Sequence, residues 1–294
     1  MISRRHFISL SSATAGAAVL GTADAFALEP RFRLVVKKWT VKAASWSAAV
    51  PALRIGILSD IHAVEPWMSA QRIGAIVTRL NALEPDVIVL LGDYVNALRP
   101  RFYSSSVPVN EWVAALSDLR APHGVHAVLG NHDWWSGEAP AIRIAFEKAG
   151  IHLLENSAVE VRSGHHSYWL AGLMDQLNYN SRGEQDVRDT LSKIAGSGPV
   201  IFLAHEPDIF VHVPSMVALT LAGHTHGGQV YIPFIGRPVL ERQPFRGCGK
   251  YAYGHFDEGG RHMVVSSGLG LSHLPVRFLV PPEIAIVTLG SIEA

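Results

Sequence analysis

Five short apolar runs in this chain each lead into side chains of the types that bind metal ions. The runs begin at Leu53, Asp86, Val125, Val200 and Ala218. Stretches with helical spacing lie between them, at residues 69–83, 110–119, 140–149 and 185–194. This alternation predicts βαβ units around a buried sheet. Because open α/β sheets build their sites at the carboxyl ends of strands, the five endings are expected to meet at one edge of the fold.

The rest of the chain adds strands without marking a second domain. Ser69 and Asn110 are the expected N-terminal caps of the first two helices. No change in composition and no internal repeat separates the two halves of the mature chain. A single domain with two stacked sheets and helices outside them accounts best for this pattern. The further strands are expected at residues 159–161, 168–173, 229–232, 251–256, 263–265 and 284–289.

The composition restricts which binding partners and which kinds of metal site are expected. The 294 residues include 25 basic and 25 acidic side chains. A protein that binds nucleic acid non-specifically normally carries a basic excess, so no nucleic-acid-binding surface is expected. Cys248 is the only cysteine, which excludes an internal disulfide and a zinc site built from several thiolates. The 15 histidines point instead to metal sites with nitrogen and oxygen ligands.

Residues 1–27 have the pattern of an export signal. Arg4 and Arg5 precede a stretch rich in Ala, Ser, Gly and Thr, and Ala25-Phe26-Ala27 has the small-x-small form of a cleavage site. The paired arginines resemble a twin-arginine signal, which makes that export machinery an expected partner. A Sec signal and an uncleaved anchor are the alternatives, although the stretch is too polar and interrupted to predict a transmembrane helix. We expect an exported protein, periplasmic or associated with the cell envelope.

Residues 28–52 form the expected N-terminal edge segment. Within it, residues 31–46 alternate basic, apolar and aromatic side chains. This pattern is typical of an edge strand or hairpin whose basic side chains face solvent. Peripheral contact of these basic side chains with a membrane surface is the alternative.

The five strand endings differ in specificity. Asp-x-His and Gly-Asp are weak signals, because ordinary turns use the same residues. The His-x-His pair flanked by glycines is stronger, since alternating histidines at a strand end project poorly into a core. All five in this order are hard to explain as structural residues alone. The endings are Asp60-Ile61-His62, Gly92-Asp93, Gly130-Asn131-His132-Asp133, His205 and Gly223-His224-Thr225-His226.

This ordered set resembles the calcineurin-like metallophosphoesterase superfamily. The segments Gly268-Leu269-Gly270, 275–278 and 280–284 make the tail similar to exported or membrane-associated bacterial phosphodiesterases of that superfamily. The resemblance covers roughly residues 53–289. It implies a four-layer α-β-β-α sandwich of two mixed sheets flanked by helices, with residues 53–294 as the metallophosphoesterase domain and a two-metal site at one sheet edge.

The resemblance also implies the ligands of two divalent metal ions. Two cations about 3.5–4 Å apart provide an attacking hydroxide near pH 7 and neutralise the developing oxyanion. Nitrogen and oxygen ligands suit Mn²⁺, Fe or Zn²⁺, and the sequence does not choose among them. The implied ligands are Asp60, His62 and His226 at one metal, Asn131, His205 and His224 at the other, and Asp93 as the bridge.

By the same resemblance, His132 is the acid that protonates the leaving oxygen. Many relatives place an aspartate three residues after the bridging carboxylate to pair with this histidine, but here that position is Asn96. An amide stabilises an imidazolium less than a carboxylate does. Asp133 is a candidate to compensate, and a purely structural role for His132 is the alternative.

Side chains near the motifs leave further alternatives open. Trp134 and Trp135 either pack against the organic part of a substrate or fill the core. The apolar loops at residues 231–235 and 274–280 either pack as ordinary loops or wall a lipid-like substrate. Arg182 and Arg277 are candidate phosphate anchors.

These observations predict a dinuclear-metal hydrolase that cleaves a phosphoester, with a phosphodiester favoured. One alternative is a pyrophosphatase or monoesterase acting on a lipid-linked or nucleotide-sugar substrate. A non-catalytic metal-binding protein of the cell envelope is the alternative from another class. Loss of a bridging ligand would favour that last reading, but all seven implied ligand types are present.

Overall fold

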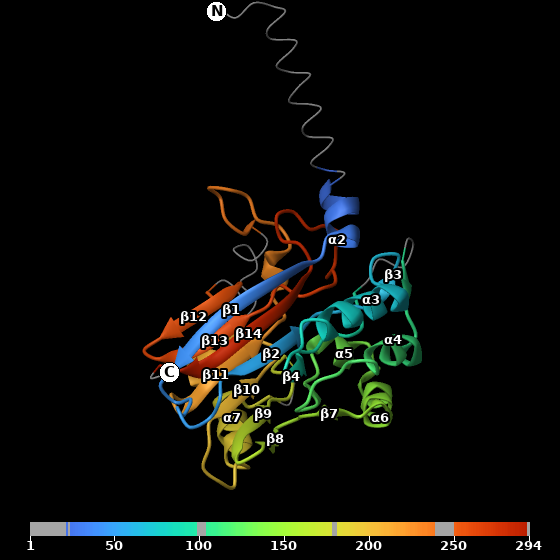
Figure 1. The fold of residues 1–294 in the computed structure, drawn as a ribbon. Coiled ribbons are helices and arrows are strands. Elements are labelled where there is room, and N and C mark those ends of the chain that lie inside the picture. The colour runs from blue at the N-terminus through green and yellow to red at the C-terminus, as the bar shows by residue number, and fades with distance from the viewer. Residues whose placement is uncertain (1–21, 23, 99–103, 178–180, 239–249, 293–294) are drawn as a thin grey trace, which may run out of the picture.

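The computed structural model describes residues 22, 24–98, 104–177, 181–238 and 250–292. They form two six-stranded sheets packed face to face, with helices outside them (Figure 1). A separate two-stranded ribbon pairs β3 (Val64–Glu65) with β5 (Ser105–Ser106).

The first sheet is mixed. Only β14 and β2 run antiparallel in it, and its other neighbours are parallel. Strands β2, β4 and β6 therefore bring their carboxyl ends to the same edge, and three motif segments follow directly from them. In spatial order the strands are β1 (Val35–Ala43), β14 (Glu283–Ser291), β2 (Leu53–Leu58), β4 (Val87–Leu90), β6 (Val125–Ala127) and β7 (Ile151–Leu153).

The second sheet is also mixed. Its four central strands are parallel, and each edge strand is antiparallel to its neighbour. The remaining motif histidines follow β10 and β11. In spatial order the strands are β12 (Gly254–Glu258), β13 (Arg261–Val265), β11 (Val217–Ala222), β10 (Val200–Leu203), β9 (His166–Gly172) and β8 (Ser157–Ser163).

Three apolar layers hold these elements together. Helices α3 (Ala70–Asn81), α4 (Val109–Leu116) and α6 (Ala139–Ala149) cover the outer face of the first sheet. Helix α7 (Glu184–Leu191) and the 3₁₀ segment η2 (Pro207–His212) cover that of the second. Aliphatic side chains from both sheets fill the space between them. The expected four-layer α-β-β-α sandwich is confirmed.

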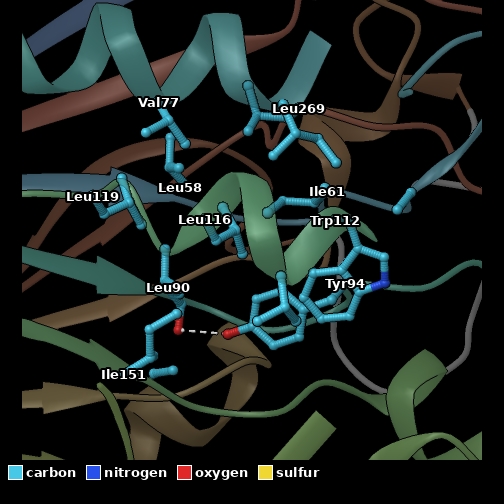
Figure 2. Packing of buried hydrophobic residues seen from close by; sticks show 14 of the residues in the cluster. Leu58, Ile61, Val77, Leu90, Tyr94, Trp112, Leu116, Leu119, Ile151 and Leu269 are labelled. Atoms are coloured by element: carbon cyan, nitrogen blue, oxygen red, sulfur yellow. Dashed lines mark hydrogen bonds between the residues drawn. The ribbon is translucent and has the colours of Figure 1, made fainter. Parts of the chain in front are cut away.

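Tyr94 links the outer apolar layer to the segment that carries Asp93. Its ring stacks on Trp112, with centroids 5.5 Å apart, and meets Phe146 edge-on at 5.0 Å. Its hydroxyl donates to the carbonyl oxygens of Leu90, at 3.2 Å (Figure 2), and Val128, at 2.8 Å. The residue next to Asp93 is thus fixed by both packing and hydrogen bonds.

Some expected elements differ from those observed. Ser69 does cap α3, since its hydroxyl accepts from the Arg72 amide. Helix α4, however, begins at Val109 with Pro108 at the cap, so Asn110 lies inside the first turn and its capping role was wrong. Proline suits a helix start because its φ is already helical.

Short elements account for the other differences. Residues 229–232 form no strand and make only isolated bridges. The three-residue strand β7 and the five-residue helix α5 (Asn131–Trp135) were not expected. Elements this short offer too few residues for a period to be read from the sequence.

The N-terminal segment packs onto the domain. The π-helical turn η1 (Asp24–Leu28) and α2 (Glu29–Phe32) lead into β1, which lies at the sheet edge as expected and exposes Lys37 and Lys38. The buried Glu29 carboxylate accepts from the amides of Leu279, at 3.1 Å, and Val280, at 2.6 Å.

The predicted export signal is only partly visible. Residues 1–21 and 23 lie outside the described residues, and the expected cleavage point after Ala27 falls within η1. In the part of the chain that the structure describes, no helix is long and apolar enough to cross a membrane.

The buried His126, on β6, predicts acid sensitivity. Its Nε2 lies 3.0 Å from the His123 carbonyl oxygen, and its ring stacks on that of His152. Burial lowers the pKa of His126 to about 4. Between this value and about 6.5 the unfolded chain binds the extra proton, so stability falls as pH drops through that window, by up to about 3 kcal/mol.

Replacement His126→Gln should therefore flatten the dependence of the free energy of unfolding on pH between 7 and 5. Urea titrations at several pH values measure it. His165→Gln, on the exposed β8–β9 turn, serves as control for loss of a histidine. Equal slopes for His126→Gln and the wild type would contradict this account.

Candidate metal centre

The segments that follow β2, β4 and β11 hold unusual backbone conformations. Among the described residues, eleven non-glycine residues have a positive φ, and five of these are among the seven implied metal ligands. Left-handed backbone is uncommon outside glycine, and strain of this kind gathers at functional sites. The five are Asp60 (φ 50°), His62 (44°), Asp93 (55°), His224 (70°) and His226 (51°).

One cluster joins the first sheet to the second. The ligand atoms of Asp60, His62, Asp93 and His226 all lie within 4.8 Å of one another, and all four residues are buried. His62 Nε2 lies 3.0 Å from His226 Nε2 and 3.5 Å from Asp93 Oδ2. His226 Nε2 lies 3.5 Å from Asp60 Oδ1. Two nitrogens and two carboxylates therefore converge on one point.

A second cluster shares Asp93 with the first. The ligand atoms of Asp93, His205 and His224 also lie within 4.8 Å of one another. Asn131 Oδ1 adds an oxygen donor, 3.2 Å from His205 Nε2 and 3.0 Å from His224 Nδ1. The structure thus brings together all seven implied ligands in the two groups that the resemblance gave.

Asp93 occupies the junction of the two clusters. Its Oδ2 lies 3.5 Å from His62 Nε2 and 3.2 Å from His205 Nε2, so one oxygen faces a nitrogen of each group. Its Oδ1 accepts from the His132 amide at 2.8 Å. A single carboxylate oxygen is therefore directed toward both positions where a cation would sit.

Hydrogen bonds to carbonyl oxygens fix which nitrogen His62 and His205 offer. His62 Nδ1 lies 2.9 Å from the Val95 carbonyl oxygen, and His205 Nδ1 lies 2.7 Å from that of Leu91. A carbonyl only accepts, so Nδ1 carries the proton and Nε2 presents its lone pair to the cluster.

The electrostatics of the clusters call for a cation. Burial lowers the pKa of both His62 and His224 to about 3, which keeps these imidazoles neutral. Burial, with the neighbouring Asp93, raises the pKa of Asp60 to about 7. Although burial lowers it, the adjacent Asp93 carboxylate holds the pKa of His205 well above its ordinary value, so a positive charge is favoured beside Asp93. The residues present therefore fit divalent metal ions with nitrogen and oxygen ligands.

Two glycines allow this crowding. A Cβ on Gly130 would lie 2.6 Å from the Asp93 amide nitrogen and 2.7 Å from His205 Cε1. A Cβ on Gly223 would clash with Ser59 Oγ and lie 2.6 Å from Asp60 Oδ2. The glycines of the motifs are thus required by close approach, not only by turn geometry.

Asp133 positions the loop that carries Asp93. Its carboxylate accepts from the backbone amides of Asp93, at 2.9 Å, Tyr94, at 2.8 Å, Val95, at 3.2 Å, and Gly130, at 2.9 Å. The hypothesis that Asp133 tunes His132 is not supported, because these backbone amides occupy its oxygens. The position of Asp133 within Gly-Asn-His-Asp marks it in the sequence as a candidate functional residue. Only the fold shows from which amides its carboxylate accepts hydrogen bonds.

A backbone amide, rather than Asn96, holds the His132 side chain. The Ala97 amide donates to His132 Nδ1 at 3.1 Å. Asn96 instead donates to the Leu271 carbonyl oxygen and accepts from the Leu98 amide. Because an amide only donates, Nδ1 is unprotonated in this geometry and Nε2 of the neutral ring carries the proton.

The tryptophans and arginines near the motifs divide between core and surface. Trp134 packs against the core beneath Arg143, whereas Trp135 is 53% exposed and its ring lies 5.3 Å from that of His132. Arg277 is fully buried and donates to three carbonyl oxygens, so its assignment as a phosphate anchor was wrong. Arg182 pairs with Asp186 and Asp189.

Comparison with known proteins gives these clusters a context. The family model described as calcineurin-like phosphoesterase matches residues 53–231. The chain belongs to this family. The match includes every element that carries an implied ligand.

Relatives of this phosphoesterase extend the likeness. It is 31% identical to the metallophosphoesterase YkuE of Bacillus subtilis, over 99% of this chain and 98% of that protein. It is 29% identical to a metallophosphoesterase of Aquifex aeolicus, over 87% of this chain and 92% of that one. A transmembrane protein with a metallophosphoesterase domain from Danio rerio is 29% identical over 81% of this chain, which spans only 53% of that protein. A dimetal phosphatase structure from Danio rerio aligns with 75% of this chain and 88% of its own, with TM-score 0.39 and 11% identity.

Replacement Asp133→Asn should weaken metal binding by this phosphoesterase about 10–100-fold, because an amide nitrogen would replace one acceptor of the Asp93 loop amides. Competition between the protein and a chelator measures the affinity. Asp118→Asn, whose native side chain is 77% exposed, is the matched control. Unchanged affinity in the Asp133 variant would show that the loop holds Asp93 without this carboxylate.

Proposed function

We propose that the protein hydrolyses a phosphodiester at a centre of two divalent metal ions. The observation that carries this proposal is the single Asp93 oxygen that faces both clusters. One ion would be held by Asp60, His62, His226 and Asp93, and the other by Asn131, His205, His224 and Asp93. These nitrogen and oxygen donors suit Mn²⁺, Fe or Zn²⁺.

The chain's own residues prepare the chemistry. When bound, the two cations supply the Lewis acidity that activates water and offsets charge on the phosphoryl oxygens. Asn131 contributes a neutral oxygen, which limits the negative charge around the pair. His132 Nε2–H is free of the Ala97 contact and is available to donate to the leaving oxygen. The hydrogen bond from the His132 backbone amide to Asp93 fixes the position of His132 relative to the clusters.

Two arginines beside the centre favour a diester over a monoester. Arg277 directs its guanidinium to carbonyl oxygens. Arg237 donates to the Gly227 carbonyl oxygen and lies over the rings of Tyr231, at 5.4 Å, and Tyr253, at 5.1 Å. Within the described part of the chain, neither of these arginines is left to balance the second charge of a monoester, so a singly charged diester fits better.

A lipid-linked pyrophosphate is the second candidate substrate. It is supported by exposed apolar side chains close to His132, since Trp135 is 53% exposed and Leu274 is 59% exposed. His273, next to Leu274, has its ring 6.5 Å from that of His132. An apolar substrate group could rest on these side chains while its phosphate reaches the clusters.

The test compares phosphate monoesters, diesters and pyrophosphates on metal-loaded protein and on Asp93→Asn. We expect highest kcat/KM for diesters and loss of at least about 100-fold in Asp93→Asn, because a neutral amide cannot bridge two cations. Metal content should fall from two ions toward one. Asp257→Asn, which is exposed, controls for loss of an acidic residue. Near-normal turnover with two ions bound to Asp93→Asn would refute the bridging role.

We also propose export by the twin-arginine pathway to the periplasm or cell envelope, on the basis of the N-terminal sequence alone. This route moves folded proteins, which suits a chain that acquires its metals before export.

Replacement of Arg4 and Arg5 by lysine should leave the precursor in the cytoplasm, because a receptor reads the arginine pair. Cell fractionation with immunodetection measures this distribution. Replacement of Arg31 and Arg33 by lysine is the control. Normal export of the Arg4, Arg5 variant would indicate a Sec signal and remove the argument for metal loading before export.

A further inference from the structure

Exposed apolar side chains are concentrated on one face of the molecule. The structure exposes fourteen large hydrophobic residues in its described part, and eight of them belong to three segments, residues 26–32, 231–235 and 274–279. We name these segments the apolar face. Its exposed members are Phe26, Leu28, Phe32, Tyr231, Phe234, Ile235, Leu274 and Leu279.

Hydrogen bonds join the three segments into one surface. The Arg277 amide donates to the Ala25 carbonyl oxygen at 2.9 Å, and Glu29 accepts from the amides that follow Phe278. Phe278 in turn exchanges backbone hydrogen bonds with residues 229 and 231. In Figure 1 these loops, orange and dark red, gather at the same end of the molecule as α2. Segments about 250 residues apart in sequence therefore form a continuous face.

The tip of this face projects outward rather than packing. Backbone bonds between Ile232 and Gly236 close a tight turn. Phe234 stands in that turn with φ 68° and is fully exposed, and Ile235 is 63% exposed. A phenylalanine in left-handed backbone is strained, and a fully exposed ring makes no packing contacts that would offset this strain. Such a side chain is explained by contact with something outside the chain.

The apolar face lies beside the metal centre. The Tyr231–Ile235 loop begins five residues after His226. Gly227 packs tightly against the adjoining segments, because a Cβ added there would meet Val280 and Arg237. Leu274 follows His273, whose ring approaches that of His132. A surface that docked here would lie close to the side of the centre that carries His132 and His273.

Charge points to a lipid surface as the occupant. The expected cleavage after Ala27 would remove Phe26, and the face of the mature chain keeps the other seven exposed side chains. Arg31, exposed and 5.3 Å over the Phe32 ring, and the exposed Lys37 and Lys38 flank it. Apolar side chains bordered by basic ones fit the boundary between acyl chains and anionic headgroups.

We propose that the apolar face docks onto an anionic lipid bilayer, with Phe234 and Ile235 inserted at the headgroup boundary. Docking depends on surface chemistry alone, so it holds whether or not the protein is a diesterase. A second copy of the chain covering the face is the competing outcome that the experiment must detect.

A fluorescent probe on the loop tests insertion directly. In full-length protein with Cys248→Ser, Ile235→Cys is labelled with an environment-sensitive dye. Met216→Cys is the control, because Met216 is 55% exposed in the native chain and Ile235 is 63% exposed. With phosphatidylcholine–phosphatidylglycerol vesicles, the dye at position 235 should gain intensity and be quenched by nitroxide lipids. The dye at position 216 should do neither. Identical responses at both positions, or no response at 235, would overturn the proposal.

Vesicle affinity provides a second measurement. Replacing Phe234 and Ile235 by serine should lower binding about tenfold or more, since each loses apolar area that the bilayer would bury. Replacing Val211 and Met216 by serine should leave binding unchanged. Hydrolysis of a soluble ester by both variants checks their folding. Vesicle binding by the Phe234, Ile235 variant equal to that of the wild type would overturn docking. A dye response at position 235 that rises with protein concentration without vesicles would also overturn it, and would indicate self-association instead.

Discussion

The shared position of the Asp93 carboxylate sets the requirements that the rest of the structure meets. Its Oδ2 faces His62, which follows β2 of the first sheet, and His205, which follows β10 of the second. The centre therefore exists only while the two sheets keep their relative positions. The aliphatic layer between them, packed at the density of a solid, resists that displacement. A change that loosens the packing between the sheets is therefore expected to distort the site as well.

Convergence of so many lone pairs also needs stiff surroundings. Left-handed backbone at five implied ligands and the absent Cβ of Gly130 and Gly223 bring donor atoms closer than ordinary turns allow. Asp133 holds the Asp93 loop by three backbone amides and accepts a fourth bond from Gly130, and Tyr94, the residue after Asp93, stacks on Trp112 in the apolar layer. Supports of this kind preorganise ligands, because each ligand's own rotamer is fixed by its neighbours.

The same edge of the sandwich serves two different surfaces. Buried ligands come from the first residues after each strand, and the exposed apolar side chains come from the loops farther along, at residues 231–235 and 274–279. The Glu29 carboxylate joins the N-terminal segment to the second of these loops. Whatever contacts the apolar face is thereby placed next to His132 and the clusters, without requiring any change in the buried core.

The sequence alone determined the strand-helix rhythm, the stacked sheets and the metal-binding residue types after five strands, because period and residue type are local properties. The assignment of seven of these residues as ligands came from the family resemblance. The sequence did not determine short elements such as β7, or the failure of residues 229–232 to form a strand. Tertiary structure alone decided that Arg277 serves carbonyl oxygens, that Ala97 rather than Asn96 holds His132, and that Trp134 is packed while Trp135 is exposed. Each of these depends on which distant backbone groups come within hydrogen-bond or packing distance. That is set by how the sheets and loops assemble, which no local pattern encodes.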